Sequence, residues 1–219
     1  EGLPTNPETV YSLHEGPNLI SYPFAGSAPI EATIPDAAQD SIEAILGEGV
    51  AAMNAGDGWI GGLVNLSGTE GYWFITNEEV SFTYDPPVEG AARKASPIRS
   101  VPMEFAFRQS TQQAFYFVNN ATIGGEPIEK EDLIIAYNGD VRVGSRYWYG
   151  DVTDVPAMGV SFSDLSAGYC ISGDQVSFKI WDESEQELVN MVADVETNWQ
   201  NNSFTIISLS DIQQIIPHK

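Results

Sequence analysis

The residue types best suited to nucleophilic or metal chemistry are scarce in this chain, which has two histidines and one cysteine. His14 lies beside a turn signal, and His218 lies next to the C-terminus. A Ser-His-Asp or Cys-His nucleophile needs a well-placed, buried histidine, and a zinc site needs several such ligands together. We therefore predict no catalytic residues and no enzymatic activity.

Cys170 is the single cysteine, so the chain cannot form an internal disulfide. Its neighbours, Tyr169 and Ile171, favour a small hydrophobic residue inside a core. An intermolecular disulfide or a reactive thiol is the alternative.

Carboxylates are the most abundant chemical groups, with 31 Asp and Glu residues against 9 Lys and Arg. Paired carboxylates can hydrolyse glycosides, but one of the pair must lie in a cleft where burial raises its pKa. Here most acids lie in polar turns, which predicts a solvated surface. Two such groups are Glu126, Glu129, Glu131 and Asp132, and Asp182, Glu183, Glu185 and Glu187.

Calcium is the inorganic partner that these acids suit best, because Ca²⁺ takes six to eight oxygen ligands from loop carboxylates and carbonyls. Asp151, Asp154 and Asp164 fall in what reads as the longest irregular stretch of the second half. They are the candidate ligands, and no other cofactor is indicated.

The run Tyr147-Trp148-Tyr149 is the aromatic cluster that most suggests a binding surface. Flat aromatic faces bind sugars by stacking on their C–H groups. The alternative is a core Trp148 flanked by two tyrosines at its rim, because side chains alternate between the two faces of a strand.

Three Asn-x-Ser/Thr triplets, at Asn65, Asn120 and Asn201, are candidate glycosylation sites if the protein is exported.

The formal net charge of −22 narrows the range of partners. Such a field repels the phosphates of nucleic acids and anionic membrane surfaces. A hydrophobic fraction of 42% nevertheless indicates a folded chain. No apolar run approaches the length of about 18 residues that crosses a bilayer, so membrane insertion is not expected.

The first half predicts a β-domain over residues 14–85, preceded by an arm or strand over residues 1–13. Expected strands alternate with turns rich in Gly, Asn and Pro. One short helix is predicted near residues 40–47, where Ile42, Ile45 and Leu46 share a helical face and Gly47 can end it. Prolines then indicate a linker over residues 86–100.

The second half, residues 101–219, predicts a β-sandwich of about seven short strands. Asn138-Gly139 is a strong signal for a hairpin between two of them. The fold class is therefore mainly β, with two sandwich-like domains. The expected strands of this half are 103–107, 114–118, 133–137, 141–145, 176–181, 188–192 and 204–208.

Two groups of motifs resemble modules of large secreted or surface proteins from marine and anaerobic bacteria. The first half resembles a module that begins G-W-N-L-I-S-x-P and closes with G-Y-W, here at residues 16–23 and 71–73, with Pro17 in place of the Trp. The second resembles a companion module with Q-A-F-Y-F at 113–117, D-V-P-x-M-G at 154–159 and F-K-I-x-D at 178–182. The resemblance implies export and β-architecture, and it implies no activity or site.

These observations favour a non-catalytic structural subunit, secreted and located outside the cell or on its surface, that forms or decorates a filament, sheath or surface layer. The first residue, Glu1, fits a processed N-terminus. We expect self-association into a homopolymer, in which the N-terminal arm adds a strand to the next copy. The alternative is a carbohydrate-binding module that uses Tyr147, Trp148 or Tyr149 for adhesion to a glycan.

Overall fold

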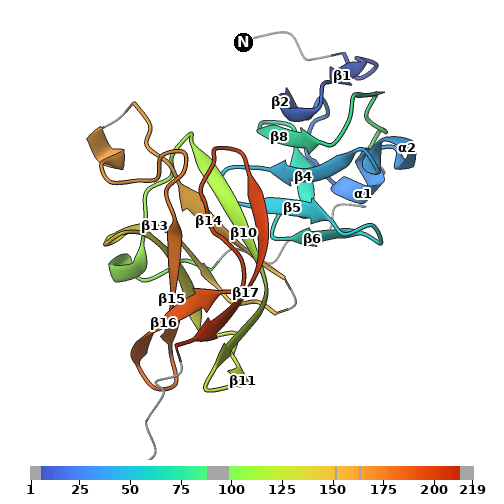
Figure 1. The fold of residues 1–219 in the computed structure, drawn as a ribbon. Helices are drawn as coiled ribbons and strands as arrows, with labels where there is room; N and C mark the ends of the chain where they lie inside the picture. Colours follow the sequence, from blue (N-terminus) through green and yellow to red (C-terminus); the bar gives the residue numbers. More distant parts are fainter. Residues whose placement is uncertain (1–5, 88–98, 151, 163, 213–219) are drawn as a thin grey trace, which may run out of the picture. The chain divides into compact units, whose positions relative to one another are not determined.

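The computed structural model describes residues 6–87, 99–150, 152–162 and 164–212. The protein is mainly β, as predicted, and divides into two compact units, residues 1–98 and 99–219 (Figure 1). That division falls inside the segment 86–100 predicted as a linker.

The first unit is built on a five-stranded antiparallel sheet. Strand β8 pairs with β2 on one side and with β4, the central strand, on the other. The strands, in spatial order, are β2 (Gly16–Ser21), β8 (Gly71–Thr76), β4 (Ile42–Leu46), β5 (Ala51–Asn54) and β6 (Trp59–Gly61).

Two small sheets and two short helices complete this unit. The sheets pair β1 (Tyr11–Leu13) with β9 (Val80–Phe82) and β3 (Ser27–Pro29) with β7 (Asn65–Ser67). The helices α1 (Ile30–Thr33) and α2 (Asp36–Gln39) each follow a proline. Apolar side chains from all these parts form one core, which includes Ile30, Ile45 and Phe74.

The helix predicted near residues 40–47 is wrong, because this segment contains strand β4. A bulge explains the error: the register against β8 shifts between Ile42 and Ala44, and Glu43 is exposed. The extra residue puts Ile42 and Ile45 on the same face of the sheet, where both join the core. An i, i+3 apolar spacing therefore arises here without a helix.

The segment 1–13, predicted as an N-terminal arm or strand, is in part a strand of its own unit. Residues 1–5 lie outside the described residues, but Tyr11, Ser12 and Leu13 pair with Phe82, Ser81 and Val80. Leu13 is buried in the core, and Tyr11 packs against it. This segment is not a free arm within the described chain.

The second unit is one eight-stranded sheet that curls into a half-barrel. The long strand β10 is paired on one side with β14 and β11 and on the other, in parallel, with β17. The strands are β10 (Gln113–Ile123), β11 (Glu126–Pro127), β12 (Leu133–Asn138), β13 (Val141–Tyr147), β14 (Thr153–Met158), β15 (Val176–Asp182), β16 (Glu187–Ala193) and β17 (Phe204–Asp211). The predicted hairpin at Asn138-Gly139 is confirmed, with Gly139 at a φ of 56° between β12 and β13.

The curl brings β13 and β14, which lie at opposite ends of the sheet, into contact. At Gly144 a Cβ atom would lie 1.6 Å from the carbonyl oxygen of Pro156, so only glycine allows this approach. Farther along, the guanidinium Nε of Arg146 donates a hydrogen bond to the Asp154 carbonyl (3.0 Å). The two edge strands of the curled sheet are thus held together by a close backbone contact and by a hydrogen bond from a side chain.

Strand β14 was missed in the sequence, where residues 146–175 read as largely irregular. All six residues of β14 are buried, although they include Asp154 and Pro156. Proline and aspartate are depleted in strands, which hid the pattern. Conversely, the strand expected over residues 103–107 is a short 3₁₀ helix, Met103–Phe105, whose Phe105 packs on the outer face of β12.

The Gly144 contact gives a direct test of the closure. Gly144→Ala forces the Cβ atom into the β14 backbone, so we expect the unfolding free energy of this unit to fall by more than about 3 kcal/mol. Urea unfolding followed by tryptophan fluorescence measures this change. In the control Gly71→Ala, the added Cβ lies at ordinary contact distances, 3.7 Å from Leu19 Cδ1 and 3.9 Å from the Ile20 carbonyl oxygen. If Gly144→Ala and the control are equally stable, β13 and β14 are not in close backbone contact at Gly144.

Candidate functional site

The aromatic run at residues 147–149 does not present one flat face. Trp148 packs against the inner core of the half-barrel, whereas Tyr147 packs on the outer face against a separate apolar cluster. The guanidinium carbon of Arg99 lies 3.8 Å from the centre of the Tyr147 ring and covers it. The structure therefore separates the residues predicted to bind a sugar.

Tyr149 is the third member of the run, and its hydroxyl is turned toward β14. It donates a short hydrogen bond to the Asp154 carboxylate, and the Asp154 backbone N–H donates to it in return (3.2 Å). Burial of the hydroxyl, and then the negative charge of Asp154, raise the pKa of Tyr149. Tyr149 as a whole is 40% exposed, but these two hydrogen bonds hold its hydroxyl against β14.

Asp154, one of the predicted calcium ligands, is fully buried at 0% exposure. Its carboxylate lies 3.4 Å from Nη2 of Arg146, which is itself buried. Asp151 lies outside the described residues, and the side chain of Asp164 is not described either. In the described part of the chain, no three His, Cys, Asp or Glu side chains group to hold a metal ion.

Buried carboxylates also serve as caps for backbone N–H groups. Asp132 was expected on the solvated surface but is only 5% exposed. Its two carboxylate oxygens accept hydrogen bonds from the backbone N–H groups of Glu129 (2.7 Å) and Glu183 (3.0 Å). These hydrogen bonds connect two loops, so the role of the Asp132 carboxylate is structural.

The three candidate glycosylation sites differ in access. Asn120 is exposed on β10, directly after a bulge in its register with β17. Asn65 is half-buried in β7. Asn201 is half-buried too, and its side-chain oxygen accepts a hydrogen bond from the backbone of Gln113 (3.0 Å). Asn120 is therefore the most accessible of the three.

His14 is exposed beside strand β1. Its Nδ1 is 2.7 Å from the Glu15 carbonyl oxygen, and the nearby Ser81 hydroxyl donates to Ser12 (3.0 Å). His14, Ser12 and Ser81 help to line a shallow groove of about 460 Å³ along β1 and β9. The contact with the Glu15 carbonyl turns the imidazole of His14 toward the backbone of the next residue.

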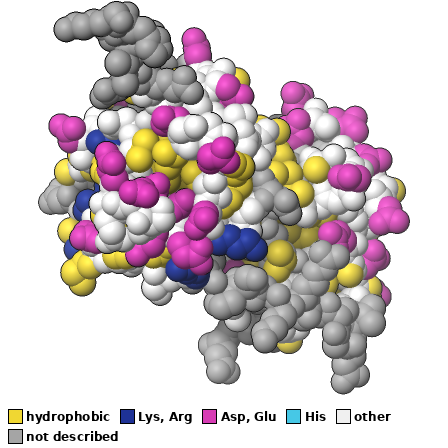
Figure 2. Space-filling view, turned by 90° about the horizontal axis from the view of Figure 1, so that it is seen from below, with side chains coloured by type: hydrophobic (Ala, Val, Ile, Leu, Met, Phe, Trp, Pro, Cys, Tyr) yellow, Lys and Arg dark blue, Asp and Glu magenta, His cyan; other side chains and the backbone are white. Residues whose placement is uncertain are grey.

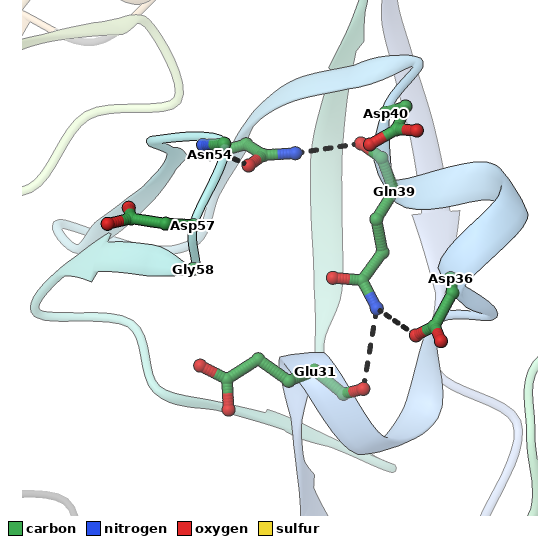
Figure 3. Close-up of a pocket in the computed structure, with 8 residues that line it drawn as sticks. Glu31, Asp36, Gln39, Asp40, Asn54, Asp57 and Gly58 are labelled. Carbon is green, nitrogen blue, oxygen red and sulfur yellow. Dashed lines mark hydrogen bonds between the residues drawn. The ribbon is translucent and has the colours of Figure 1, made fainter.

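An acidic pocket of about 370 Å³ lies between the helices of the first unit and the β5–β6 turn (Figure 3). The amide of Gln39 is its fixed part: it donates to the Ile34 carbonyl (2.8 Å) and accepts from the Trp59 indole (2.9 Å). No sequence motif indicated this pocket, because its acids come from α1, from α2 and the residue after it, and from the β5–β6 turn. They are Glu31, Asp36, Asp40 and Asp57.

A second pocket, of about 350 Å³, lies in the other unit, and its lining carries no formal charge. Val160, Ile171, Trp199, Gln112 and Gln200 are among the residues that line it. We call it the neutral pocket. It contrasts with an acidic surface, part of which Figure 2 shows, where carboxylates are scattered over the face in view.

Cys170 also borders the neutral pocket and is buried, as predicted, at 1% exposure. Burial, and then the nearby charge of Asp174, raise the pKa of its thiol to about 12.

No protein-family model, curated protein or solved structure matches this chain. Among the described residues, no helix is both long enough and apolar enough to span a membrane.

The buried ion pair yields a prediction about stability. Arg146→Met strands the Asp154 carboxylate in the core, so we expect a loss of about 3–5 kcal/mol in unfolding free energy. The double variant Arg146→Met with Asp154→Leu removes both charges and should recover most of that loss. Urea unfolding of the full mutant cycle measures the coupling. Arg142→Met, on the exposed face of the same strand, is the control and should change stability by less than about 0.5 kcal/mol. Additive effects of the two substitutions would contradict the proposed pairing.

The Cys170 thiol gives a second prediction. At pH 8 a thiol with a pKa of about 12 is almost entirely protonated, and burial blocks reagents, so Ellman's reagent should not label the native protein. In urea the same thiol should react at once. Rapid labelling without denaturant would show that the neutral pocket opens around Cys170.

Proposed function

We propose that this protein is a non-catalytic structural subunit of an extracellular filament, sheath or surface layer, and that its copies join by exchanging strand β1. The observation that carries the proposal is the position of β1. It belongs to a two-stranded sheet with β9, and its ladder has only three residue pairs. The strand is thus a small, separable part of the first unit.

The side chains of β1 make specific packing contacts within the first unit. Leu13 is 5% exposed within the core, and the ring of Tyr11 stacks on Phe82 with centroids 6.1 Å apart. Tyr11 also meets Tyr84 edge to face at 5.2 Å. These contacts define which strand fits beside β9, so that a copy of β1 from another molecule would be recognised.

Exchange of β1 costs little in principle, because the swapped strand makes the same ladder and the same core contacts as the original. Residues 14 and 15, both exposed, lie between β1 and β2 and would act as the hinge. If each copy gives its β1 to the next, the contact is head-to-tail and the chain of copies stays open. The proposal therefore replaces a free arm with an exchanged strand.

Electrostatics favours such assembly in a salty medium. At a net charge of −22, copies repel one another at low ionic strength. Salt at about 0.15 M screens charges beyond about 8 Å, and the β1–β9 contact itself is apolar or neutral. An extracellular location meets that condition and agrees with the resemblance to secreted modules.

A disulfide trap tests the exchange directly. Ser12 and Ser81 face each other across the β1–β9 ladder, with hydroxyl oxygens 3.0 Å apart. In a Cys170→Ala background, oxidised Ser12→Cys/Ser81→Cys should give a covalent ladder of multimers on a non-reducing denaturing gel. Its length should grow with protein and salt concentration.

The matched control uses Ser27→Cys/Ser67→Cys, which face each other in the internal β3–β7 pair. That variant should give only a linkage within one chain. If the β1–β9 variant likewise gives only monomers at every concentration, β1 stays in its own molecule and the proposed assembly is wrong.

A further inference from the structure

We propose that the neutral pocket of the second unit binds an uncharged sugar unit of a polysaccharide. This inference concerns a different unit from strand exchange and does not depend on it. It also moves the expected glycan site away from Tyr147, Trp148 and Tyr149, whose rings the structure places on separate surfaces.

The floor of the neutral pocket is rigid. The indole N–H of Trp199 donates to the Ala157 carbonyl (2.9 Å), and its backbone N–H donates to the Asp174 carbonyl (2.7 Å). Gly159 lies directly against the indole, where a Cβ atom would come within 2.4 Å of the ring. Trp199 is 4% exposed, so it supports the pocket and presents little of its own surface.

Two aliphatic side chains form the wall that a sugar could pack against. Val160 is 42% exposed and Ile171 is 59% exposed. Their segments are joined by hydrogen bonds from the Val160 N–H to the Cys170 carbonyl (2.9 Å) and from the Cys170 N–H to the Met158 carbonyl (3.1 Å). Exposed aliphatic groups held on fixed backbone suit the C–H face of a sugar ring, which is apolar.

The remaining lining residues carry carboxamides or a hydroxyl: they are Gln112, Gln200, Asn201 and Ser172. The side-chain oxygen of Asn201 already accepts a hydrogen bond from the Gln113 N–H (3.0 Å). The backbone of Gln112 is fixed, because its carbonyl accepts from the Gly159 N–H (2.8 Å) and its N–H donates to the Ser110 hydroxyl (3.1 Å). Carboxamides and hydroxyls both donate and accept hydrogen bonds. Sugar hydroxyls do the same, so the two sets of groups are complementary.

Charge decides which sugars fit. The neutral pocket has no charged lining residue, whereas the acidic pocket has four carboxylates and the groove along β1 has Glu79. A cation would therefore prefer the acidic pocket. An anionic sugar would be repelled by the net charge of −22 and would find no cation in the neutral pocket.

The pocket volume of about 350 Å³ lies at the lower end of the range for small-molecule sites, about 300–1,000 Å³. It is therefore suited to a short stretch of a glycan. For a subunit that assembles outside a cell, such a site would attach the assembly to a neutral polysaccharide of a wall or matrix.

Saturation-transfer NMR on the full chain tests the inference. The probes are the neutral tetrasaccharides cellotetraose, laminaritetraose, maltotetraose and mannotetraose, with tetragalacturonate as the anionic probe and tetra-alanine as a peptide probe. We expect transfer to at least one neutral tetrasaccharide at ligand concentrations of up to about 10 mM, the range of weak single-site binding. Neither tetragalacturonate nor tetra-alanine should respond.

Variants then locate the site. Gln112→Ala/Gln200→Ala removes two lining carboxamides and should weaken binding about tenfold or more, since each hydrogen bond contributes about 0.5–1.5 kcal/mol. Gln175→Ala, an exposed glutamine outside the lining, is the control and should bind as the wild type does. Matching urea transitions establish that all variants are folded.

The inference is overturned if no neutral tetrasaccharide binds, if the double variant binds as well as wild type, or if only tetragalacturonate or tetra-alanine binds. Each of these results leaves the disulfide trap for β1 unaffected, and a failed trap leaves the sugar titration unaffected. The two proposals can therefore fail separately.

Discussion

The second unit depends on how its single sheet closes on itself. Strands β13 and β14 belong to opposite ends of the sheet, yet they meet where Gly144 touches the Pro156 carbonyl and where Arg146 reaches Asp154. The ion pair is buried, so its net stabilisation is small while the cost of breaking it is large. The ion pair therefore selects the register of β13 against β14, because any other register would leave a buried charge without its partner. The hydroxyl of Tyr149 and the loop that carries it follow from that register, as does the neutral pocket, which begins where β14 ends.

The acidic composition is partly structural. Asp132 is not the only carboxylate that caps backbone groups. The Asp174 carboxylate accepts hydrogen bonds from the Ile171 N–H (3.0 Å) and from the Asn138 amide (2.9 Å). The Asp194 carboxylate accepts one from the Ser208 N–H (2.8 Å). The hydrogen bond from Ser208 lowers the pKa of Asp194. A fold of many short strands has many loop N–H groups without ladder partners, and short carboxylates satisfy them. The negative charge of the chain is therefore in part a consequence of how its turns are built.

The sequence predicted the features that depend on local chemistry. The β class followed from the composition and the spacing of turns, and the hairpin at Asn138-Gly139 followed from the need for a positive φ at Gly139. Bulges defeated the periodicity: in β4 the extra residue at Glu43 imitated a helix, and in β10 the core residues pass from Val118 to Ala121 across another register shift. Strand β14 was hidden because it contains Asp154 and Pro156, whose residue types are depleted in strands. Asp154 is tolerated there because Arg146 and Tyr149 contact its carboxylate in the folded sheet. The neutral pocket could not be predicted, because Gln112, Val160, Ile171 and Gln200 meet only after folding.

The two proposals assign different physics to the two units. Joining β1 to a neighbour's β9 brings two strongly negative molecules together, so it depends on ionic strength even though the contact surface is apolar. Binding a neutral sugar brings no charge to the protein, so its affinity should be nearly independent of salt. A surface layer needs both properties. Its copies must associate more strongly as the salt concentration rises, and its attachment to the support must not depend on the salt concentration. The uncharged pocket on this acidic chain is the feature that would allow salt-independent attachment alongside salt-dependent association.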